Sequence, residues 1–214
     1  MHHWPLFDLR ITTPRLELRY TDDDIAAELM TLAATDGVHA PDFMPFSTPW
    51  TRLEEPRLQQ EGMKFYWRTR AETGPDHWML PMAVFEDGTL VGMQDLKGVR
   101  FSVTRSVLTG SWLGRSHQGK GIGKEMRSAV LHLAFAELGA EVAETSAFAD
   151  NPASIGVTRA LGYTDNGWYL DVREGQQARH LRFLMTREDW AARRRDDITV
   201  EGVEPCLSQL LADA

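Results

Sequence analysis

Residues 110–124 most strongly limit what this 214-residue chain can fold into. Residues 106–113 have the composition of a strand, residues 118–123 contain three glycines, and apolar residues recur at helical spacing from 122 to 138. The predicted order is therefore strand, glycine-rich loop and helix. Such a loop can turn its backbone N–H groups inward, and the helix start adds free donors and a positive dipole end. We therefore expect a phosphate-bearing ligand at this loop.

Two common phosphate-binding patterns each fail here by one residue. Residues 114–120 fit the nucleoside-triphosphate loop, but the next position is Gly121, which has no hydroxyl to hold Mg²⁺. The dinucleotide pattern requires a glycine where this chain has Lys124. The hexamer Gln118-Gly119-Lys120-Gly121-Ile122-Gly123 instead resembles the coenzyme A loop of the Gcn5-related N-acetyltransferases (GNAT). An ordinary strand–helix turn is the alternative interpretation.

Composition and charge restrict the class of protein. A hydrophobic content of 43% and a charged content of 25% are typical of one globular domain. The net charge of −8 argues against general binding to nucleic acid or to anionic membranes. No apolar stretch approaches the ~20 residues that span a bilayer, and the start lacks the pattern of a signal peptide. Because Cys206 is the single cysteine, we expect no intrachain disulfide and a cytoplasmic location.

The remaining pattern predicts an α+β chain. A proline-rich segment, residues 37–51, joins the first two helices and is either a substrate-covering loop or a plain connection. Asp87-Gly88 predicts a hairpin, and residues 99–104 are expected to continue its meander. The strand after the loop helix should lie parallel to the strand before it, through a right-handed crossover. The expected strands are 13–19, 78–86, 89–96, 99–104, 106–113, 141–148, 168–174 and 180–186. The expected helices are 22–34, 52–72, 122–138 and 152–160, followed by a polar helical turn at 188–195.

A second motif supports the family resemblance. Residues 151–155, Asn-Pro-Ala-Ser-Ile, and residues 161–163, Leu-Gly-Tyr, resemble a segment of the RimJ/RimL branch of these acetyltransferases. The likeness runs from Thr13-Pro14-Arg15-Leu16 to Trp190. It implies a central mixed, mostly antiparallel sheet with flanking helices, in which two strands splay apart and take the pantetheine arm. We expect one acyl-CoA N-acyltransferase domain over residues 1–190 and a C-terminal extension over 191–214.

The resemblance also implies which residues bind the coenzyme. Backbone N–H groups of the loop would hold the pyrophosphate, and the end of the preceding strand would bind the pantetheine amides. The expected coenzyme-binding residues are Trp112, Leu113, Gln118, Gly119, Lys120, Gly121, Ile122, Gly123, Lys124, Asn151 and Ser154.

Asn151 and Ser154 are the expected catalytic residues. Acyl transfer to an amine requires a neutral nitrogen, a held thioester and a proton donor for the departing thiolate. Many relatives carry a tyrosine as that donor at the position of Thr158, so Ser154 is the favoured donor here, while Asn151 also fits a helix cap. No His, Asp or Cys grouping predicts a metal. The general base is left open between a water relay and four side chains: Asp95, Glu144, His77 and His117.

The predicted function is acyl-CoA-dependent N-acyl transfer by direct attack of a primary amine on the thioester. Acetyl-CoA is the expected donor, and succinyl-CoA is the alternative within the same fold. A non-catalytic coenzyme A-binding regulatory module is the alternative from another class. We expect a small-molecule or peptide amine as acceptor, and a homodimer or higher homo-oligomer on account of the seven tryptophans and the extension. The residues that could bind a succinyl carboxylate are Ser111, Gln94, His39 and Arg52.

Overall fold

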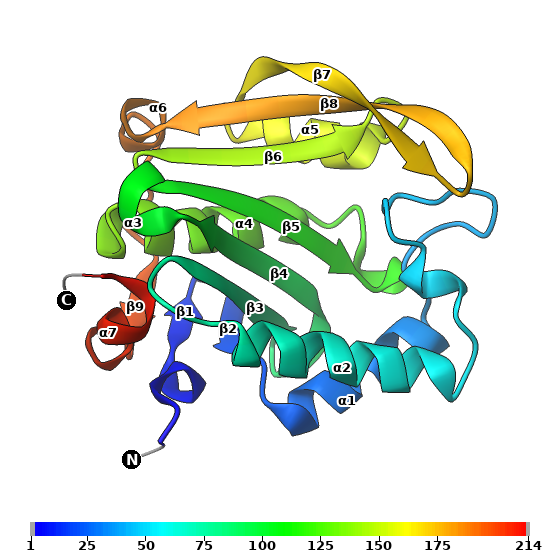
Figure 1. Cartoon of the computed structure of the whole chain (residues 1–214), viewed down its shortest axis with the longest axis horizontal. Helices are drawn as coiled ribbons and strands as arrows, with labels where there is room; N and C mark the ends of the chain where they lie inside the picture. Colours follow the sequence, from blue (N-terminus) through cyan, green and yellow to red (C-terminus); the bar gives the residue numbers. More distant parts are fainter. Residues whose placement is uncertain (1–2, 213–214) are drawn as a thin grey trace.

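The computed structural model describes residues 3–212, which form a nine-stranded sheet with helices on both faces (Figure 1). The strand order is β7-β8-β6-β5-β4-β3-β2-β1-β9. Among the described residues, β5 and β6 are the only parallel neighbours. This mixed, mostly antiparallel sheet confirms the expected α+β class. Residues 1–2 and 213–214, at the outer ends of the two predicted units, lie outside the described residues.

The strands are β1 (Arg10–Thr12), β2 (Leu16–Tyr20), β3 (His77–Glu86), β4 (Thr89–Val99), β5 (Ser106–Leu113), β6 (Val142–Phe148), β7 (Thr164–Arg173), β8 (Gln176–Thr186) and β9 (Thr199–Glu201). The α-helices are α1 (Asp23–Thr35), α2 (Arg57–Ala71), α3 (Phe101–Thr104), α4 (Ile122–His132), α5 (Pro152–Ala160), α6 (Arg187–Ala191) and α7 (Leu207–Leu210). A π-helical turn, Leu133–Glu137, extends α4, and short 3₁₀ turns cover Pro5–Asp8, Trp50–Arg52, Arg115–His117 and Glu204–Cys206.

Two hydrophobic clusters cover the two faces of the sheet. Leu16 and Leu18 of β2 belong to the larger cluster, together with the buried side of α4. Met93 of β4 and Trp112 of β5 belong to the smaller one, which lies under α1 and α2. Because side chains alternate between the two faces of a strand, neighbouring residues of β4 and β5 face different clusters. This separation of α4 from α1 and α2 decides which side chains meet in the site.

The chain between β4 and β5 differs from the prediction. We expected residues 99–104 to continue the meander, but β4 ends at Val99 and the next residues form α3. Arg100 has a φ of 50°, so the backbone leaves the extended conformation there. The Phe101 ring is fully buried, 5.1 Å from that of Trp78. Burial of this ring stabilises a helical turn where sequence alternation suggested a strand.

The second predicted helix begins later than expected. A 3₁₀ turn ends at Arg52, residues 53–56 are irregular, and α2 starts at Arg57, directly after Pro56. Proline fits immediately before or at a helix start because it has no N–H to donate. The proline-rich segment therefore extends to residue 56.

The C-terminal segment packs on the N-terminal half of the sheet. β9 pairs antiparallel with β1, which makes it an edge strand. Cys206 and Leu210 are buried in the larger cluster, and the Leu210 carbonyl accepts a hydrogen bond from the Trp78 indole N–H at 3.1 Å. Cys206 is thus a core residue and does not line the cleft described below.

β5 and β6 pair only at their first residues. Their parallel register joins residues 106–108 to residues 142–144. Beyond it the strands separate, and the Thr145 hydroxyl donates to the Thr109 carbonyl at 3.1 Å where they diverge. β4 stays paired with β5 to Leu113, and β8 stays paired with β6 to Phe148. The expected splayed strand pair is therefore present, and it divides the sheet into two halves (Figure 1).

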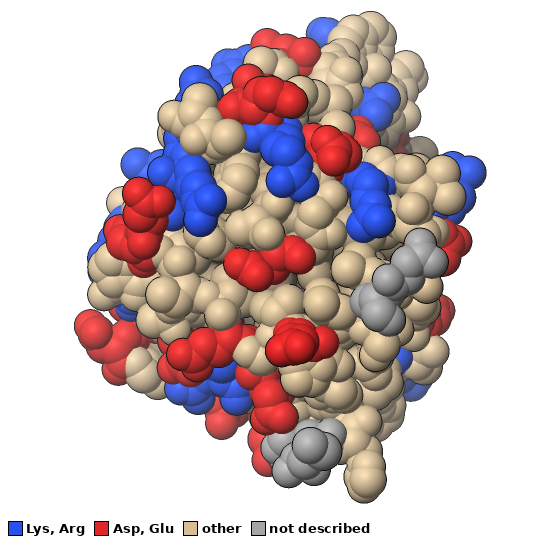
Figure 2. All heavy atoms as spheres, turned by 90° about the vertical axis from the view of Figure 1, so that its left-hand side faces the viewer, with Lys and Arg blue, Asp and Glu red and all other residues tan. Residues whose placement is uncertain are grey.

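The surface carries charges of both signs. Figure 2 shows acidic and basic side chains interspersed with uncharged ones on the face remote from the proline-rich segment. Within residues 3–212, no helix is both long and apolar enough to cross a membrane. Trp168, Leu170 and Val172 are exposed along the edge strand β7. Homo-oligomerisation stays a prediction.

Candidate active site

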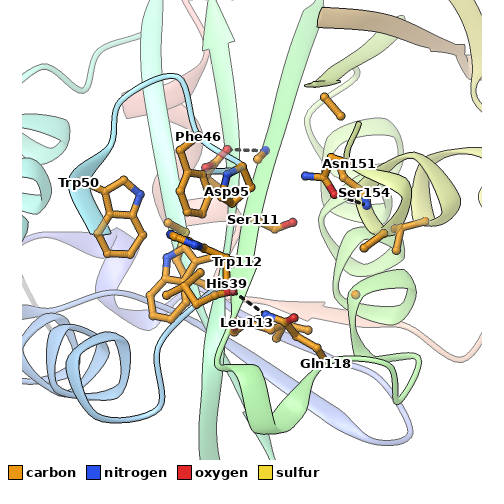
Figure 3. A pocket seen from close by; sticks show the side chains of 18 of the residues that line it. His39, Phe46, Trp50, Asp95, Ser111, Trp112, Leu113, Gln118, Asn151 and Ser154 are labelled. Carbon is orange, nitrogen blue, oxygen red and sulfur yellow. Dashed lines mark hydrogen bonds between the residues drawn. The ribbon is translucent and has the colours of Figure 1, made fainter. Parts of the chain in front are cut away.

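A cleft of about 1480 Å³ opens where β5 and β6 separate (Figure 3). The middle of β4, the end of β5, the proline-rich segment and α2 form one wall. The ends of β6 and the start of α5 form the other wall. The glycine-rich loop and the start of α4 line the same cleft. The two motifs singled out in the sequence therefore meet across the divergence of the strands.

The glycine-rich loop is held in a conformation that favours glycine. Gly119 and Gly121 have φ angles of 75° and 85°, in the left-handed region, and Gly121 directly precedes α4. The Gln118 side-chain amide donates to the Leu113 carbonyl at 2.9 Å and to the Val38 carbonyl at 2.7 Å. Gln118 thus fixes the start of the loop to the end of β5.

Most of the predicted coenzyme-binding residues line the cleft. Those that do are Trp112, Leu113, Gln118, Gly119, Gly121, Gly123, Lys124, Asn151 and Ser154. The Ile122 side chain is fully buried in the core, so Ile122 can offer only backbone atoms. Lys120 does not line the cleft, and its carbonyl accepts a hydrogen bond from Arg15.

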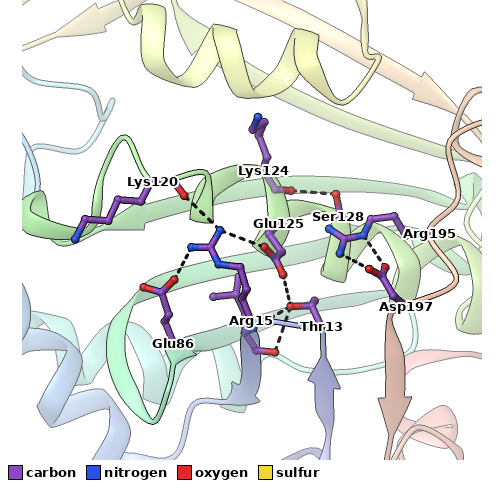
Figure 4. A network of polar contacts seen from close by, with 10 residues as sticks. Thr13, Arg15, Glu86, Lys120, Lys124, Glu125, Ser128, Arg195 and Asp197 are labelled. Atoms are coloured by element: carbon purple, nitrogen blue, oxygen red, sulfur yellow. Dashed lines mark hydrogen bonds and ion pairs between the residues drawn. The ribbon is translucent and has the colours of Figure 1, made fainter.

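Arg15 and Thr13 connect the N-terminal strands to the loop (Figure 4). The Arg15 guanidinium donates to the Lys120 carbonyl at 3.3 Å, pairs with Glu86, and lies 3.6 Å from a Glu125 oxygen. Glu125, in the first turn of α4, is buried and accepts a 2.7 Å hydrogen bond from the Thr13 hydroxyl. A buried carboxylate requires such partners. The Thr-Pro-Arg-Leu segment at residues 13–16 therefore braces the loop and the helix start together.

The start of α5 uses its predicted cap. The Asn151 side-chain oxygen accepts from the Ser154 N–H at 3.1 Å, which is an N-cap hydrogen bond. Within the described part of the chain, the Ser154 hydroxyl makes no hydrogen bond. The Thr158 hydroxyl donates to the Ser154 carbonyl at 2.9 Å and accepts from Arg127 at 2.9 Å. Both of its hydrogen-bonding functions are thus engaged within the protein.

Arg127 is a site residue that the sequence analysis missed. It projects from α4, is only 4% exposed, and lines the cleft. One guanidinium nitrogen donates to Thr158, and the other donates to the Ser111 hydroxyl at 3.3 Å. Burial lowers the pKa of this guanidinium, and the charge of Asp95 opposes that change. The available signal was its position four residues before Leu131, on the apolar stripe of the helix.

Asp95 lines the opposite wall of the cleft, on β4 (Figure 3). One carboxylate oxygen accepts from the Gly110 N–H at 2.7 Å. Burial raises the pKa of Asp95 to about 6, although the Gly110 hydrogen bond and the Arg127 charge act in the opposite direction. A Cβ on Gly110 would lie 2.8 Å from the other carboxylate oxygen. A glycine inside β5 is therefore what makes room for this carboxylate.

The other three candidate bases lie outside the cleft. Glu144, His77 and His117 do not line it. Glu144 accepts a 3.0 Å hydrogen bond from Arg182 on β8. No group of His, Cys, Asp and Glu residues among residues 3–212 could hold a metal ion. Of the four side chains considered from the sequence, the structure brings only Asp95 to the cleft.

Two further acids line the cleft, and each is held by a cation. A hydrogen bond from Lys64 lowers the pKa of Glu61. Arg173 makes two 2.8 Å hydrogen bonds to Asp150 and lowers its pKa. A carboxylate that is already paired with a cation has a lowered pKa and is therefore a weaker general base. Asp95 is thus the cleft-lining acid whose pKa is raised.

The family model of the acetyltransferase (GNAT) domain matches residues 15–164. The chain belongs to the GNAT acetyltransferase family. The match confirms the enzyme class that the two motifs predicted, and it covers the loop, α4, Asp95 and the start of α5.

Solved structures of similar fold include members of the predicted branch. The chain is 23% identical to RimJ of Mycobacterium smegmatis, solved with a coenzyme A disulfide, with a TM-score of 0.69 over 90% of this chain and 98% of that one. It is 19% identical to RimL, a ribosomal L7/L12 α-N-protein acetyltransferase, with a TM-score of 0.67 over 81% and 95%. It is 24% identical to a putative ribosomal-protein-serine acetyltransferase from Vibrio cholerae, with a TM-score of 0.62 over 83% and 97%. Each of these structures is less than 25% identical to this chain, and the likeness shows a shared fold.

Replacing Arg15 should loosen the glycine-rich loop without unfolding the protein. In Arg15→Gln we expect several-fold faster amide hydrogen exchange at residues 124–125, whose N–H groups donate to the Gly121 carbonyl, because the Lys120 carbonyl and Glu125 lose their cationic partner. Hydrogen exchange followed by mass spectrometry measures this.

The matched control is Arg182→Gln, which breaks an exposed ion pair with Glu144 away from the loop. It should leave exchange at residues 124–125 unchanged. Equal exchange at residues 124–125 in Arg15→Gln and wild type would show that Arg15 does not brace the loop and the helix start.

Proposed function

We propose that this chain transfers an acetyl group from acetyl-CoA to a primary amine by direct attack. One observation carries the proposal. A single cleft joins a glycine-rich loop at a helix start to a carboxylate whose pKa is raised, through the gap between two diverging strands.

The residues of the cleft fit an acyl coenzyme A. The loop and the first turn of α4 present backbone N–H groups at a positive helix end, which suits a pyrophosphate. β5 has no partner strand on its β6 side beyond residue 108, which leaves main-chain groups for the amides of a pantetheine arm. Lys124 lines the cleft beside the loop and adds positive charge. Acetyl-CoA, when bound, supplies a thioester carbonyl carbon that an amine can attack.

Asp95 is proposed as the general base. The attacking amine must lose one proton as its nitrogen forms the new C–N bond. A carboxylate with a pKa of about 6 is largely deprotonated at pH 7 and is a stronger base than an ordinary aspartate. The Gly110 hydrogen bond fixes the orientation of its carboxylate.

Ser154 and Arg127 are proposed to stabilise the departing thiolate. When the C–S bond breaks, its electron pair goes to sulfur, which then needs a proton or a hydrogen bond. The hydroxyl of Ser154 can donate that hydrogen bond. The buried Arg127 adds positive charge beside Thr158, and Asn151 fixes the start of α5. This arrangement takes the place of the tyrosine that many relatives have at position 158.

The contacts around the cleft favour acetyl over succinyl as the acyl group. A buried succinyl carboxylate requires a cation or several donors. Arg52 is paired with Glu174 at 2.9 Å, and the Gln94 amide donates to the Gly110 carbonyl at 2.7 Å, so both are engaged. Arg127 is the observation that favours succinyl, because its cation lines the cleft. Assays with both donors decide between them.

The acceptor is proposed to be a small-molecule amine or a peptide amine. The protein is proposed to act in the cytoplasm. The single cysteine, buried in the core, supports a reducing compartment. A coenzyme A-binding module without turnover is the alternative, and it differs by binding the coenzyme while releasing no thiol.

Thiol release tests the proposed function. Wild-type protein should release free thiol from acetyl-CoA when a suitable amine is added, and less or none from succinyl-CoA. In Gly123→Val we expect coenzyme A to bind roughly tenfold or more weakly by calorimetry, because the new side chain enters the cleft at the helix start. Gly74→Ala is the control, since a Cβ there meets nothing within 4 Å. Undiminished binding in Gly123→Val would contradict the loop assignment.

The pH profile tests Asp95. Its folded pKa is raised, so the base form accumulates as the pH rises through about 6. We expect kcat/KM for the amine to rise through that pH in wild type. In Asp95→Asn this step should be absent, with a loss of roughly 100-fold at pH 7. Glu144→Gln is the control and should keep the wild-type profile. A profile unchanged in Asp95→Asn would remove Asp95 from the mechanism.

A further inference from the structure

Aromatic side chains line the cleft on the side of the proline-rich segment (Figure 3). The ring centroids of Phe46 and Trp50 are 5.5 Å apart, and those of Trp50 and Trp112 are 5.7 Å apart. His39 stands edge-on to Phe46 at 6.1 Å. Its Nδ1 lies 2.8 Å from the Ala40 carbonyl oxygen, and its Nε2 lies 2.7 Å from the Thr51 hydroxyl oxygen, so two hydrogen bonds hold the ring in place. We call Phe46, Trp50 and Trp112 the aromatic wall.

Asp95 faces the same side as this wall. In the β4–β5 register, Met93 pairs with Trp112 and Asp95 pairs with Gly110. Residues two apart on a strand share a face, so Met93 and Asp95 both face α1 and α2, where Trp112 is buried. Tyr66 of α2 is buried nearby, and its pKa is raised by burial and then by the Asp95 charge. The proposed base is therefore surrounded by apolar and aromatic groups.

Few carboxylates line this side of the cleft that could pair with a second positive charge on the acceptor. Besides Asp95, the acid that lines this side of the cleft within residues 3–212 is Glu61, which is paired with Lys64 at 2.9 Å. Arg57 and Arg68 line the same side. A polycationic acceptor would meet these arginines and would have to be desolvated against aromatic rings without compensating anions.

Contacts between the proline-rich segment and the β7–β8 hairpin limit the size of the cleft on the side of the aromatic wall. The proline-rich segment packs on the β5 half, where Phe46 and Trp50 contact the cluster that contains Trp112, and the β7–β8 hairpin belongs to the β6 half. The Ser47 hydroxyl donates to Asp171 at 2.7 Å, and Arg52 pairs with Glu174 at 2.9 Å. Figure 1 shows the segment reaching the hairpin. These contacts favour a compact acceptor or a chain end over a folded protein surface.

We infer that the acceptor is a primary amine carried on a large apolar, aromatic body, with no second cationic group. The inference rests on the proposed function and names its substrate class. The nitrogen would lie at Asp95, and the apolar body would replace water against Met93 and the aromatic wall. Burying such a body against aromatic rings favours binding of the acceptor, whereas a small polar amine gains little there.

A set of amines tests the inference with acetyl-CoA as donor. The probes are 2-phenylethylamine, a tripeptide with an N-terminal phenylalanine, ethanolamine and spermidine. We expect kcat/KM for 2-phenylethylamine to exceed that for ethanolamine and spermidine by roughly 100-fold. The tripeptide distinguishes a peptide N-terminus from a small-molecule amine as the source of the aromatic primary amine. Comparable rates for 2-phenylethylamine and the tripeptide would indicate that the acceptor is a peptide N-terminus. Activity with 2-phenylethylamine but not with the tripeptide would indicate a small-molecule acceptor.

A pair of tryptophan variants tests the aromatic wall. In Trp50→Ala we expect KM for 2-phenylethylamine to rise about tenfold, while KM for acetyl-CoA and activity toward ethanolamine stay near wild type. Trp67→Ala is the matched control, because Trp67 is 50% exposed on α2 and does not line the cleft. Trp50→Phe should restore most of the affinity for the aromatic amine.

The outcomes separate the inference from the proposed function. If spermidine or ethanolamine is preferred, the acceptor class is wrong and the acetyltransferase function stands. If Trp50→Ala changes all acceptors equally, the wall has no role in selecting the acceptor. If wild type binds coenzyme A by calorimetry but none of the amines releases thiol, the chain behaves as the coenzyme A-binding module without turnover, and both the proposed function and the inference fail. If coenzyme A does not bind, the proposed function itself fails, and the inference fails with it.

Discussion

The end of strand pairing between β5 and β6 is the constraint on which the rest of the site depends. Backbone polar groups inside a fold need partners, and a strand that leaves its neighbour loses them on one side. Here the pairing stops at Leu108 and Glu144, while both strands stay paired on their outer sides. The resulting gap leads from the glycine-rich loop to the aromatic wall. The loop, the proposed catalytic side chains and the proposed acceptor surface therefore share one opening.

The two sides of this opening have different chemistry because strand residues alternate. On the α4 side, Ser111 and Thr158 bind the buried Arg127, so positive charge lies where a thiolate would form. On the α1 and α2 side, Asp95 lies among apolar groups, which raises its pKa. Each charge moderates the other, since Arg127 lowers the pKa of Asp95 and Asp95 raises that of Arg127. The same sheet thereby separates the proposed thiolate stabilisation from the proposed proton abstraction.

The parts of the site that depend on local sequence could be predicted, and those that depend on packing could not. The loop, the Asn151 cap and the parallel crossover follow from glycine conformations, capping chemistry and chain order. Arg127 was not predicted because the sequence does not show which side chains on other elements a helical arginine will contact. Asp95 could not be chosen over the other candidate bases, because its raised pKa arises from long-range burial. The strand expected at residues 99–104 was wrong because burial of one phenylalanine overrode local alternation.

A crystal structure of the wild-type chain with bound coenzyme A tests the central claim most directly. We expect the pyrophosphate at the backbone N–H groups of residues 119–123 and the pantetheine arm between β5 and β6. The sulfur should lie within hydrogen-bonding distance of the Ser154 hydroxyl, on the side of the gap that holds Arg127. Coenzyme A bound elsewhere on the surface, or a sulfur remote from both Ser154 and Asp95, would contradict the assignment of this cleft as the active site.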